Sequence, residues 1–129
     1  MASTSGHPIN ELICRVFYSR NSAHLEHWKT DSYAKHVALG DFYDGVIDKL
    51  DGIVELFQGL FSKVNFKEKE EDETEEEGTK DILLCLQEDV KWIVKNKSEI
   101  ANNNDAIMNL VDDIVDFYGT TIYKLRFLS

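Results

Sequence analysis

The sequence contains few of the residues that interrupt helices. A single proline and seven glycines among 129 residues leave few turn signals, which disfavours a sandwich or barrel of many short strands. No apolar run approaches the roughly 20 residues of a membrane span, and residues 1–10 have neither the basic nor the apolar part of a secretory signal. These absences favour a helical protein of the cytoplasm.

Cysteine is equally scarce. The only two, Cys14 and Cys85, are far apart and have no Cys-x-x-Cys spacing, which argues against a metal or redox pair of thiols. Both stand among apolar residues, so we interpret them as small buried side chains in a reducing compartment.

Positive charge is in short supply. The chain has 24 acidic and 14 basic residues, a formal net charge of −10, and residues 1–12 contain no lysine or arginine. Residues 68–77 (EKEEDETEEE) carry −7 of this charge and have no apolar side chain to pack, so a mobile acidic loop is expected there. Because an acidic surface repels phosphate, we expect DNA binding to be weak or absent.

Apolar residues recur at helical spacing in four segments, which predicts an all-α four-helix bundle. The expected divisions are a tail at 1–8 and a single domain at 9–129 with the acidic loop at 64–80; the helices are expected near 9–28, 33–63, 81–97 and 105–127. The loop suits either an unusual long connection or a plain up-down hairpin. Gly119, inside the last helix, suggests a close approach of another helix there.

All four histidines lie in the first 36 residues. His7 belongs to the expected tail and should face solvent, whereas His24, His27 and His36 surround the junction of the first two helices. Neutral imidazole is the commonest metal ligand in proteins, so the cluster indicates a metal site. The alternative is that these histidines are polar surface residues at a helix end.

The second helix is expected to carry an acidic stripe. On a wheel of 100° per residue, its apolar residues occupy one arc and five acids occupy another: Asp41, Asp44, Asp48, Asp51 and Glu55. Asp51 falls nearest the apolar boundary, where a carboxylate can be half buried against a partner. Asp51 and Glu55, four residues apart, repel each other unless a cation lies between them. We expect Asp41 and Asp48 to be solvated.

The order of these residues resembles the iron-oxidising site of the Dps-type mini-ferritins. His27-Trp28 ends the first helix, His36 follows on the second, and Asp51 and Glu55 come 15 and 19 residues later. In that family a His-Trp pair, a second His and an Asp-x-x-x-Glu pair form an iron site across a two-fold interface. The run Ile122–Leu128 also resembles the family's last helix.

The resemblance implies a ferritin-like four-helix bundle that binds Fe(II) with His27 and His36 of one subunit and Asp51 and Glu55 of another. Peroxide or oxygen would oxidise the iron, and ferric iron would be stored in a hollow homo-oligomer of twelve subunits, which protects against oxidative damage. The compact chain also resembles small mini-ferritin relatives of large tailed phages, which implies the cytoplasm of a bacterium or of a phage-infected bacterium.

Three departures from that family bear on activity. Gly40 stands where the family usually has an aspartate, so Asp44, one turn further, or His24, one turn before His27, would have to supply the missing ligand. The linker between Trp28 and His36 is shorter, and the acidic run replaces a short helix. The alternative is a helical-bundle structural or interaction protein with a degenerate metal site. A weaker resemblance links Arg20 and His27 to the Arg and His pair of all-helical ribonucleases.

Overall fold

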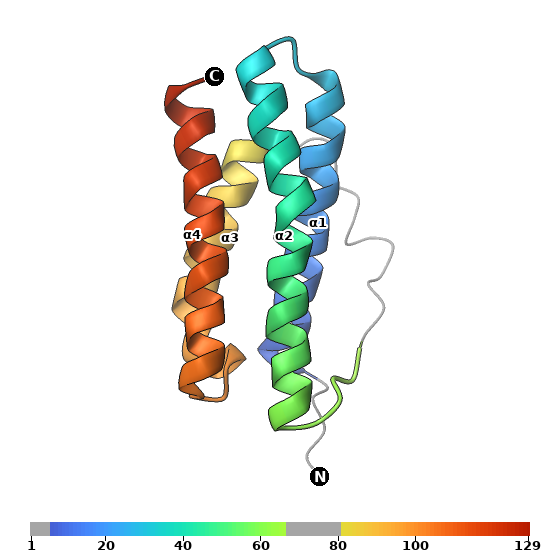
Figure 1. Cartoon of the computed structure of the whole chain (residues 1–129), viewed down its shortest axis with the longest axis vertical. Coiled ribbons are helices and arrows are strands. Elements are labelled where there is room, and N and C mark those ends of the chain that lie inside the picture. Colours follow the sequence, from blue (N-terminus) through green and yellow to red (C-terminus); the bar gives the residue numbers. More distant parts are fainter. Residues whose placement is uncertain (1–5, 67–80) are drawn as a thin grey trace.

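The computed structural model describes residues 6–66 and 81–129, and this part of the chain is an all-α four-helix bundle without strands. Figure 1 shows the helices side by side; they are α1 (Pro8–Lys29), α2 (Tyr33–Leu60), α3 (Ile82–Ile100) and α4 (Asp105–Phe127). The predicted fold class is therefore confirmed. Among the described helices, none combines the length and the apolar character needed to cross a membrane.

Polar side chains fix where each helix begins. The side chains of Ser32, Asp81 and Asn104 each accept a hydrogen bond from the backbone N–H three residues later, which satisfies a donor that the helix leaves free. The turn between α3 and α4 places Asn102 and Asn103 at φ 51° and 60°, a region that asparagine tolerates better than most residues. Short polar side chains thus set the start of three helices and the turn between α3 and α4.

His7 contradicts the expectation of a solvent-facing side chain. Its Nδ1 accepts a hydrogen bond from the backbone N–H of Ile9 at 3.0 Å, so it caps α1, while Nε2 lies 2.9 Å from Oδ1 of Asn102. The ring also packs against Phe57, with 5.1 Å between ring centroids. Pro8 is the first residue of α1, and the remainder of the predicted tail at 1–5 lies outside the described residues.

The relative direction of α2 and α3 distinguishes the two connections that the sequence left open. Figure 1 shows that α2 ends at one end of the bundle and that α3 begins towards the other, so these two helices run in the same direction. α1 packs on α2 and α3, and α4 packs on the same two helices, which leaves α2 and α3 on a diagonal. This arrangement excludes the up-down hairpin and is the single long crossover found in ferritin-like folds. The acidic run 68–77 lies outside the described residues.

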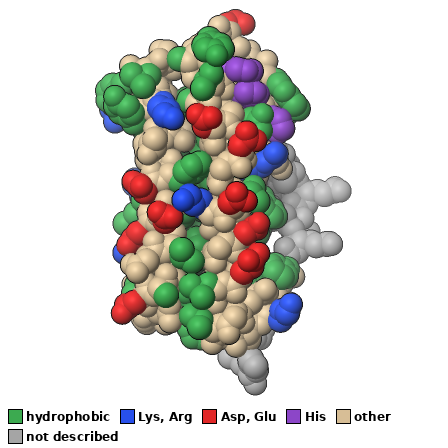
Figure 2. Space-filling view, viewed as in Figure 1, with side chains coloured by type: hydrophobic (Ala, Val, Ile, Leu, Met, Phe, Trp, Pro, Cys, Tyr) green, Lys and Arg blue, Asp and Glu red, His purple; other side chains and the backbone are tan. Residues whose placement is uncertain are grey.

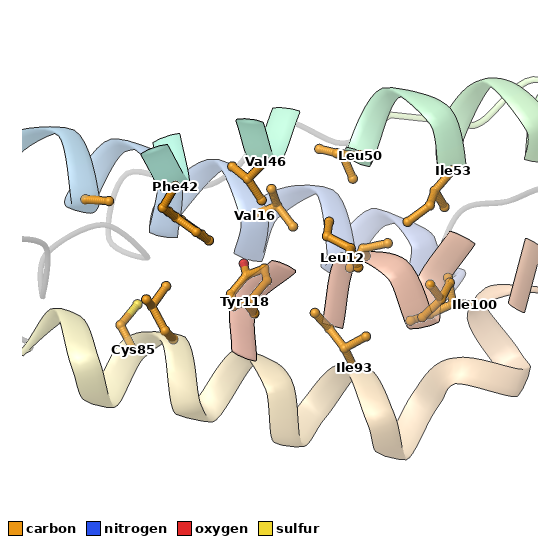
Figure 3. Close-up of a cluster of buried hydrophobic side chains, with 14 of the residues drawn as sticks. Leu12, Val16, Phe42, Val46, Leu50, Ile53, Cys85, Ile93, Ile100 and Tyr118 are labelled. Carbon is orange, nitrogen blue, oxygen red and sulfur yellow. The ribbon is translucent and has the colours of Figure 1, made fainter. Parts of the chain in front are cut away.

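Side chains from all four helices meet in one apolar core. Phe42, Phe57 and Tyr118 are its largest fully buried members, and Figure 3 shows Leu12, Val16, Leu50 and Ile93 interleaved around Tyr118. The close helix approach occurs at Gly45, where an added Cβ would lie 2.5 Å from Cζ of Phe117. The expectation for Gly119 is wrong, because a Cβ there would meet nothing within 4 Å.

Candidate metal centre

His27 and His36 form a stacked pair where α1 ends and α2 begins. Their ring centroids are 3.7 Å apart with 17° between the planes. Nδ1 of His27 lies 2.6 Å from the carbonyl oxygen of His36, and Nδ1 of His36 lies 2.8 Å from the carbonyl oxygen of His27. Figure 2 shows histidine side chains gathered at this end of the molecule. The two residues thus hold each other through their backbones as well as their rings.

These hydrogen bonds determine which ring nitrogen can bind a metal. A carbonyl oxygen can only accept, so Nδ1 of each ring carries the hydrogen, and in a neutral imidazole Nε2 then keeps its lone pair. Histidine ligands in metal sites are commonly held in this way, by an N–H to a backbone carbonyl that fixes the tautomer. His27 and His36 therefore present two Nε2 donors from a short, partly buried junction.

Aromatic side chains surround the pair on the α1 side. The His24 ring stacks on Tyr43 at 3.9 Å and packs against Trp28 at 4.4 Å, while its centroid is 6.3 Å from that of His27. Tyr43 also meets His27 edge to face at 5.1 Å, and the Arg20 guanidinium lies 5.2 Å from the Tyr43 ring centroid. His24 is thus a packing neighbour of the pair within one chain. Trp28 is 68% exposed and offers most of its ring to solvent.

The predicted acidic ligands do not join the histidines within one chain. Asp51 lies 15 residues beyond His36 on the same helix, which at 1.5 Å per residue separates the two backbones by about 22 Å. Asp44, Asp51 and Glu55 are all exposed in the single chain, and the half-burial of Asp51 against a partner stays a prediction. Figure 2 shows acidic side chains following α2 along an open face. Over residues 6–66 and 81–129, no three His, Cys, Asp or Glu side chains form a metal-sized group.

A second polar cluster, around Asp89, lies inside the bundle and was not among the predicted site residues. The Asp89 carboxylate is 3% exposed and accepts hydrogen bonds from the hydroxyls of Ser19 and Tyr118, the latter at 2.9 Å. The Arg15 guanidinium lies 3.2 Å from the other carboxylate oxygen. The Ser19 hydroxyl also lies 3.4 Å from Sγ of Cys85, which is buried as expected. The sequence contained a signal, because Asp89 falls on the apolar face of α3 between Leu86 and Ile93.

Burial governs the proton equilibria of this Asp89 cluster. Desolvation raises the pKa of Asp89, and the hydrogen bonds from Ser19, Tyr118 and Arg15 only partly offset it. Burial together with the negative charge of Asp89 raises the pKa of Tyr118 well above its ordinary value. Each carboxylate oxygen already has a donor, so the cluster joins α1, α3 and α4 in the interior of the bundle.

A family comparison covers most of the bundle. A family model matches residues 27–125, from the first histidine of the stacked pair to the last turns of α4. The chain belongs to DUF5856, a family of unknown function. No curated protein and no solved structure matches the chain.

The DUF5856 match includes His27 and His36, the acids Asp51 and Glu55, and the buried Asp89. It leaves out most of α1, which supplies Arg15 and Ser19 to the buried cluster. All the predicted metal ligands except His24, but only part of the Asp89 cluster, thus lie within the DUF5856 range.

Proposed function

We propose that this chain is a Dps-like mini-ferritin that binds and oxidises Fe(II) at a site shared between two copies and stores ferric iron in a hollow oligomer. His27 and His36 of one copy would bind the ion together with Asp51 and Glu55 of a second copy. The observation that carries the proposal is the reciprocal pair of Nδ1 hydrogen bonds, because it leaves two Nε2 lone pairs directed away from the backbone.

The separation of the ligands supports a shared site. About 22 Å of helix lies between His36 and Asp51, so a second α2 packed antiparallel would bring its acids to these histidines and would receive the first copy's acids at its own. An isologous two-fold contact creates two identical sites in this way. The exposed Trp28 and the exposed acids of α2 would then be covered by the partner.

The donor set suits the proposed chemistry. Imidazole and carboxylate ligands together bind Fe(II) and leave positions open for an oxidant. Each hydrogen peroxide molecule accepts two electrons, one from each of two Fe(II) ions, and two protons from solvent. The products are two water molecules and two Fe(III) ions. The carboxylates of Asp51 and Glu55 would stabilise the higher charge of the product.

Stopped-flow absorbance after addition of Fe(II) and peroxide to the metal-free protein tests the proposal. Wild type should form ferric product faster than buffer alone, and His27→Ala/His36→Ala and Asp51→Ala/Glu55→Ala should each lose this acceleration. Asp48→Ala, an exposed acid of the same helix, should keep it. Ferric formation no faster than in buffer, with no iron bound, would refute the proposal.

Subunit mixing tests whether the site is shared. When the double-histidine variant and the double-acid variant are refolded together in equal amounts, random pairing makes half of the dimers mixed, and one of the two sites in each mixed dimer is intact. About a quarter of the wild-type activity should return. Activity that stays at zero in a mixture shown to contain mixed dimers would place all ligands within one chain and contradict the shared site.

One observation favours a second function, a bundle that binds other proteins and has lost metal chemistry. Gly40 supplies no carboxylate beside the histidines, and the aromatic residues Trp28 and Tyr33 next to them are 68% and 81% exposed. Exposed aromatic residues are typical of protein interfaces. Iron content decides between the two: protein purified with iron present should hold more iron than His27→Ala/Glu55→Ala, and equal, near-zero content in both would favour the binding protein.

A further inference from the structure

Two of the glycines in α2 lie against a neighbouring helix, and two others do not. An ideal Cβ at Gly40 would lie 3.1 Å from Cε1 and 3.3 Å from Nδ1 of His27. A Cβ at Gly45 would meet Phe117, whereas at Gly52 and Gly59 it would meet nothing within 4 Å. At Gly40, therefore, the His27 imidazole lies against the space that a Cβ would fill.

The edge of His27 that faces Gly40 is the edge that fixes its tautomer. Nδ1 belongs to that edge, and the same atom donates the 2.6 Å hydrogen bond to the carbonyl oxygen of His36. The ring is also stacked on His36 at 3.7 Å and meets Tyr43 edge to face. The His27 ring therefore cannot move away from a Cβ at position 40 without lengthening its hydrogen bond to the carbonyl oxygen of His36 or separating from the His36 ring.

Glycine in the middle of a helix has a cost, because it is the weakest helix former after proline. Gly40 occupies the eighth position of a 28-residue helix, well away from either cap. Neither a turn nor a positive φ requires glycine there, since Gly6 is the single described glycine with positive φ. The contact with His27 is the remaining physical reason for a glycine at this position.

We propose that Gly40 is the positioning residue of the His27–His36 pair. The absence of a Cβ lets the Nδ1–Cε1 edge of His27 approach the backbone of α2 while the ring stacks on His36. Both Nδ1 hydrogens then reach carbonyl oxygens, and both Nε2 atoms remain available to a divalent metal. That these Nε2 atoms bind metal rests on the proposed function; that Gly40 fixes the rings does not. With glycine at position 40, one turn after His36 in α2, the site would have no carboxylate ligand from that position.

The first experiment compares Gly40→Ala with Gly52→Ala, the same change in the same helix at a position with open space. Co(II) binding followed by its visible absorbance should weaken about 10- to 100-fold in Gly40→Ala, the range for residues that orient a ligand, and should not change in Gly52→Ala. Long-range proton–nitrogen NMR of the metal-free proteins should show the Nδ1–H tautomer for His27 in wild type and Gly52→Ala, and a loss of that form in Gly40→Ala. Equal tautomers and equal Co(II) affinity in both variants would overturn the proposal.

A double-mutant cycle keeps the proposal falsifiable if Gly40→Ala is unstable. Adding His27→Ala removes the ring that a Cβ at position 40 would meet. The double variant Gly40→Ala/His27→Ala should therefore have a higher free energy of unfolding than His27→Ala alone. The increase should match that of Gly52→Ala over wild type. A penalty for Gly40→Ala that persists without His27 would show that the contact is irrelevant and would overturn the proposal. Absence of Co(II) and Fe(II) binding in wild type would refute the proposed function, while the tautomer and the cycle would still decide the role of Gly40.

Discussion

The molecule contains two clusters of polar side chains that differ in their hydrogen-bond partners: one bonds to backbone atoms and the other to side chains. Between α1 and α2, His27 and His36 bond only to each other's backbone through Nδ1. In the core, Asp89 bonds to the side chains of Ser19, Tyr118 and Arg15, which come from α1 and α4. The first cluster is partly buried at one end of the bundle, and the second is almost fully buried within it.

The difference separates a site that can bind a ligand from one that can only hold helices together. A ring whose Nδ1–H is bonded to a carbonyl oxygen keeps the lone pair of Nε2, so this hydrogen bond fixes the tautomer that can bind a metal. A buried carboxylate whose oxygens already accept hydrogen bonds gains nothing from a further ligand, and losing one of its donors leaves an unsatisfied group. In this protein the buried group with the perturbed pKa joins helices, and the proposed metal ligands are instead the groups with available lone pairs.

The largest expected effect comes from Asp89→Ala. The change leaves the hydroxyls of Ser19 and Tyr118 and the Arg15 guanidinium without their shared acceptor, and breaking a buried pair by removing one partner typically costs about 3–5 kcal/mol. Urea unfolding followed by circular dichroism should show a loss of this size. Co(II) binding at 4 °C, where the variant stays folded, should be unchanged.

The matched control for this variant is Asp48→Ala, which removes an exposed carboxylate and should change the free energy of unfolding by less than about 0.5 kcal/mol. His36→Ala should show the reverse pattern, with lost Co(II) binding and a stability cost of about 0.5–1.5 kcal/mol for the one hydrogen bond that its side chain makes. If Asp89→Ala weakened Co(II) binding as strongly as His36→Ala does, the two clusters would be one functional unit.

A smaller effect is expected on the opposite side of α2. Gly45→Ala places a Cβ 2.5 Å from Cζ of Phe117, and because the ring is packed against Phe42 it cannot swing away freely. Overpacking of this kind costs about 1–3 kcal/mol, whereas Gly52→Ala should gain up to about 1 kcal/mol of helix stability. Thermal unfolding measures both. A stabilised Gly45→Ala would show that α2 and α4 separate without penalty.

The helices could be predicted from the sequence because local rules and burial agree along most of the chain. The apolar period locates all four, and Ser32, Asp81 and Asn104 cap three of them as expected of short polar side chains. The second helix ends at Leu60 and not near Lys63, because Phe61 leaves the helical conformation (φ −120°, ψ −85°) and the Gln58 side chain accepts a hydrogen bond from the backbone N–H of Val64. Helix direction remained open, since period alone does not distinguish a hairpin from a crossover.

The candidate site could be predicted only as a set of residue types. Spacing brings His27 and His36 to one junction, but the exchange of Nδ1 hydrogen bonds depends on how α1 and α2 meet, which no local pattern contains. The close approach at Gly45 and the open space at Gly119 depend in the same way on which helix faces which residue. Asp89 is different, because the apolar period of α3 alone places this acid on the buried face, between Leu86 and Ile93.

The smallest expected effect, the pH dependence of stability, tests whether burial or pairing dominates at Asp89. Burial raises the folded-state pKa of this carboxyl above its unfolded value of about 3.9. The unfolded chain then ionises first as the pH rises, so the contribution of Asp89 is complete below the unfolded pKa and is lost as the pH rises through the folded one. The free energy of unfolding of wild type minus that of Asp89→Asn should therefore fall with pH, by about 1.4 kcal/mol per unit of raised pKa, and then level off. Urea unfolding of the two proteins at a series of pH values measures this difference. A difference that rises with pH would mean that Arg15 and the two hydroxyls outweigh desolvation, and that the core cluster favours the ionised carboxylate.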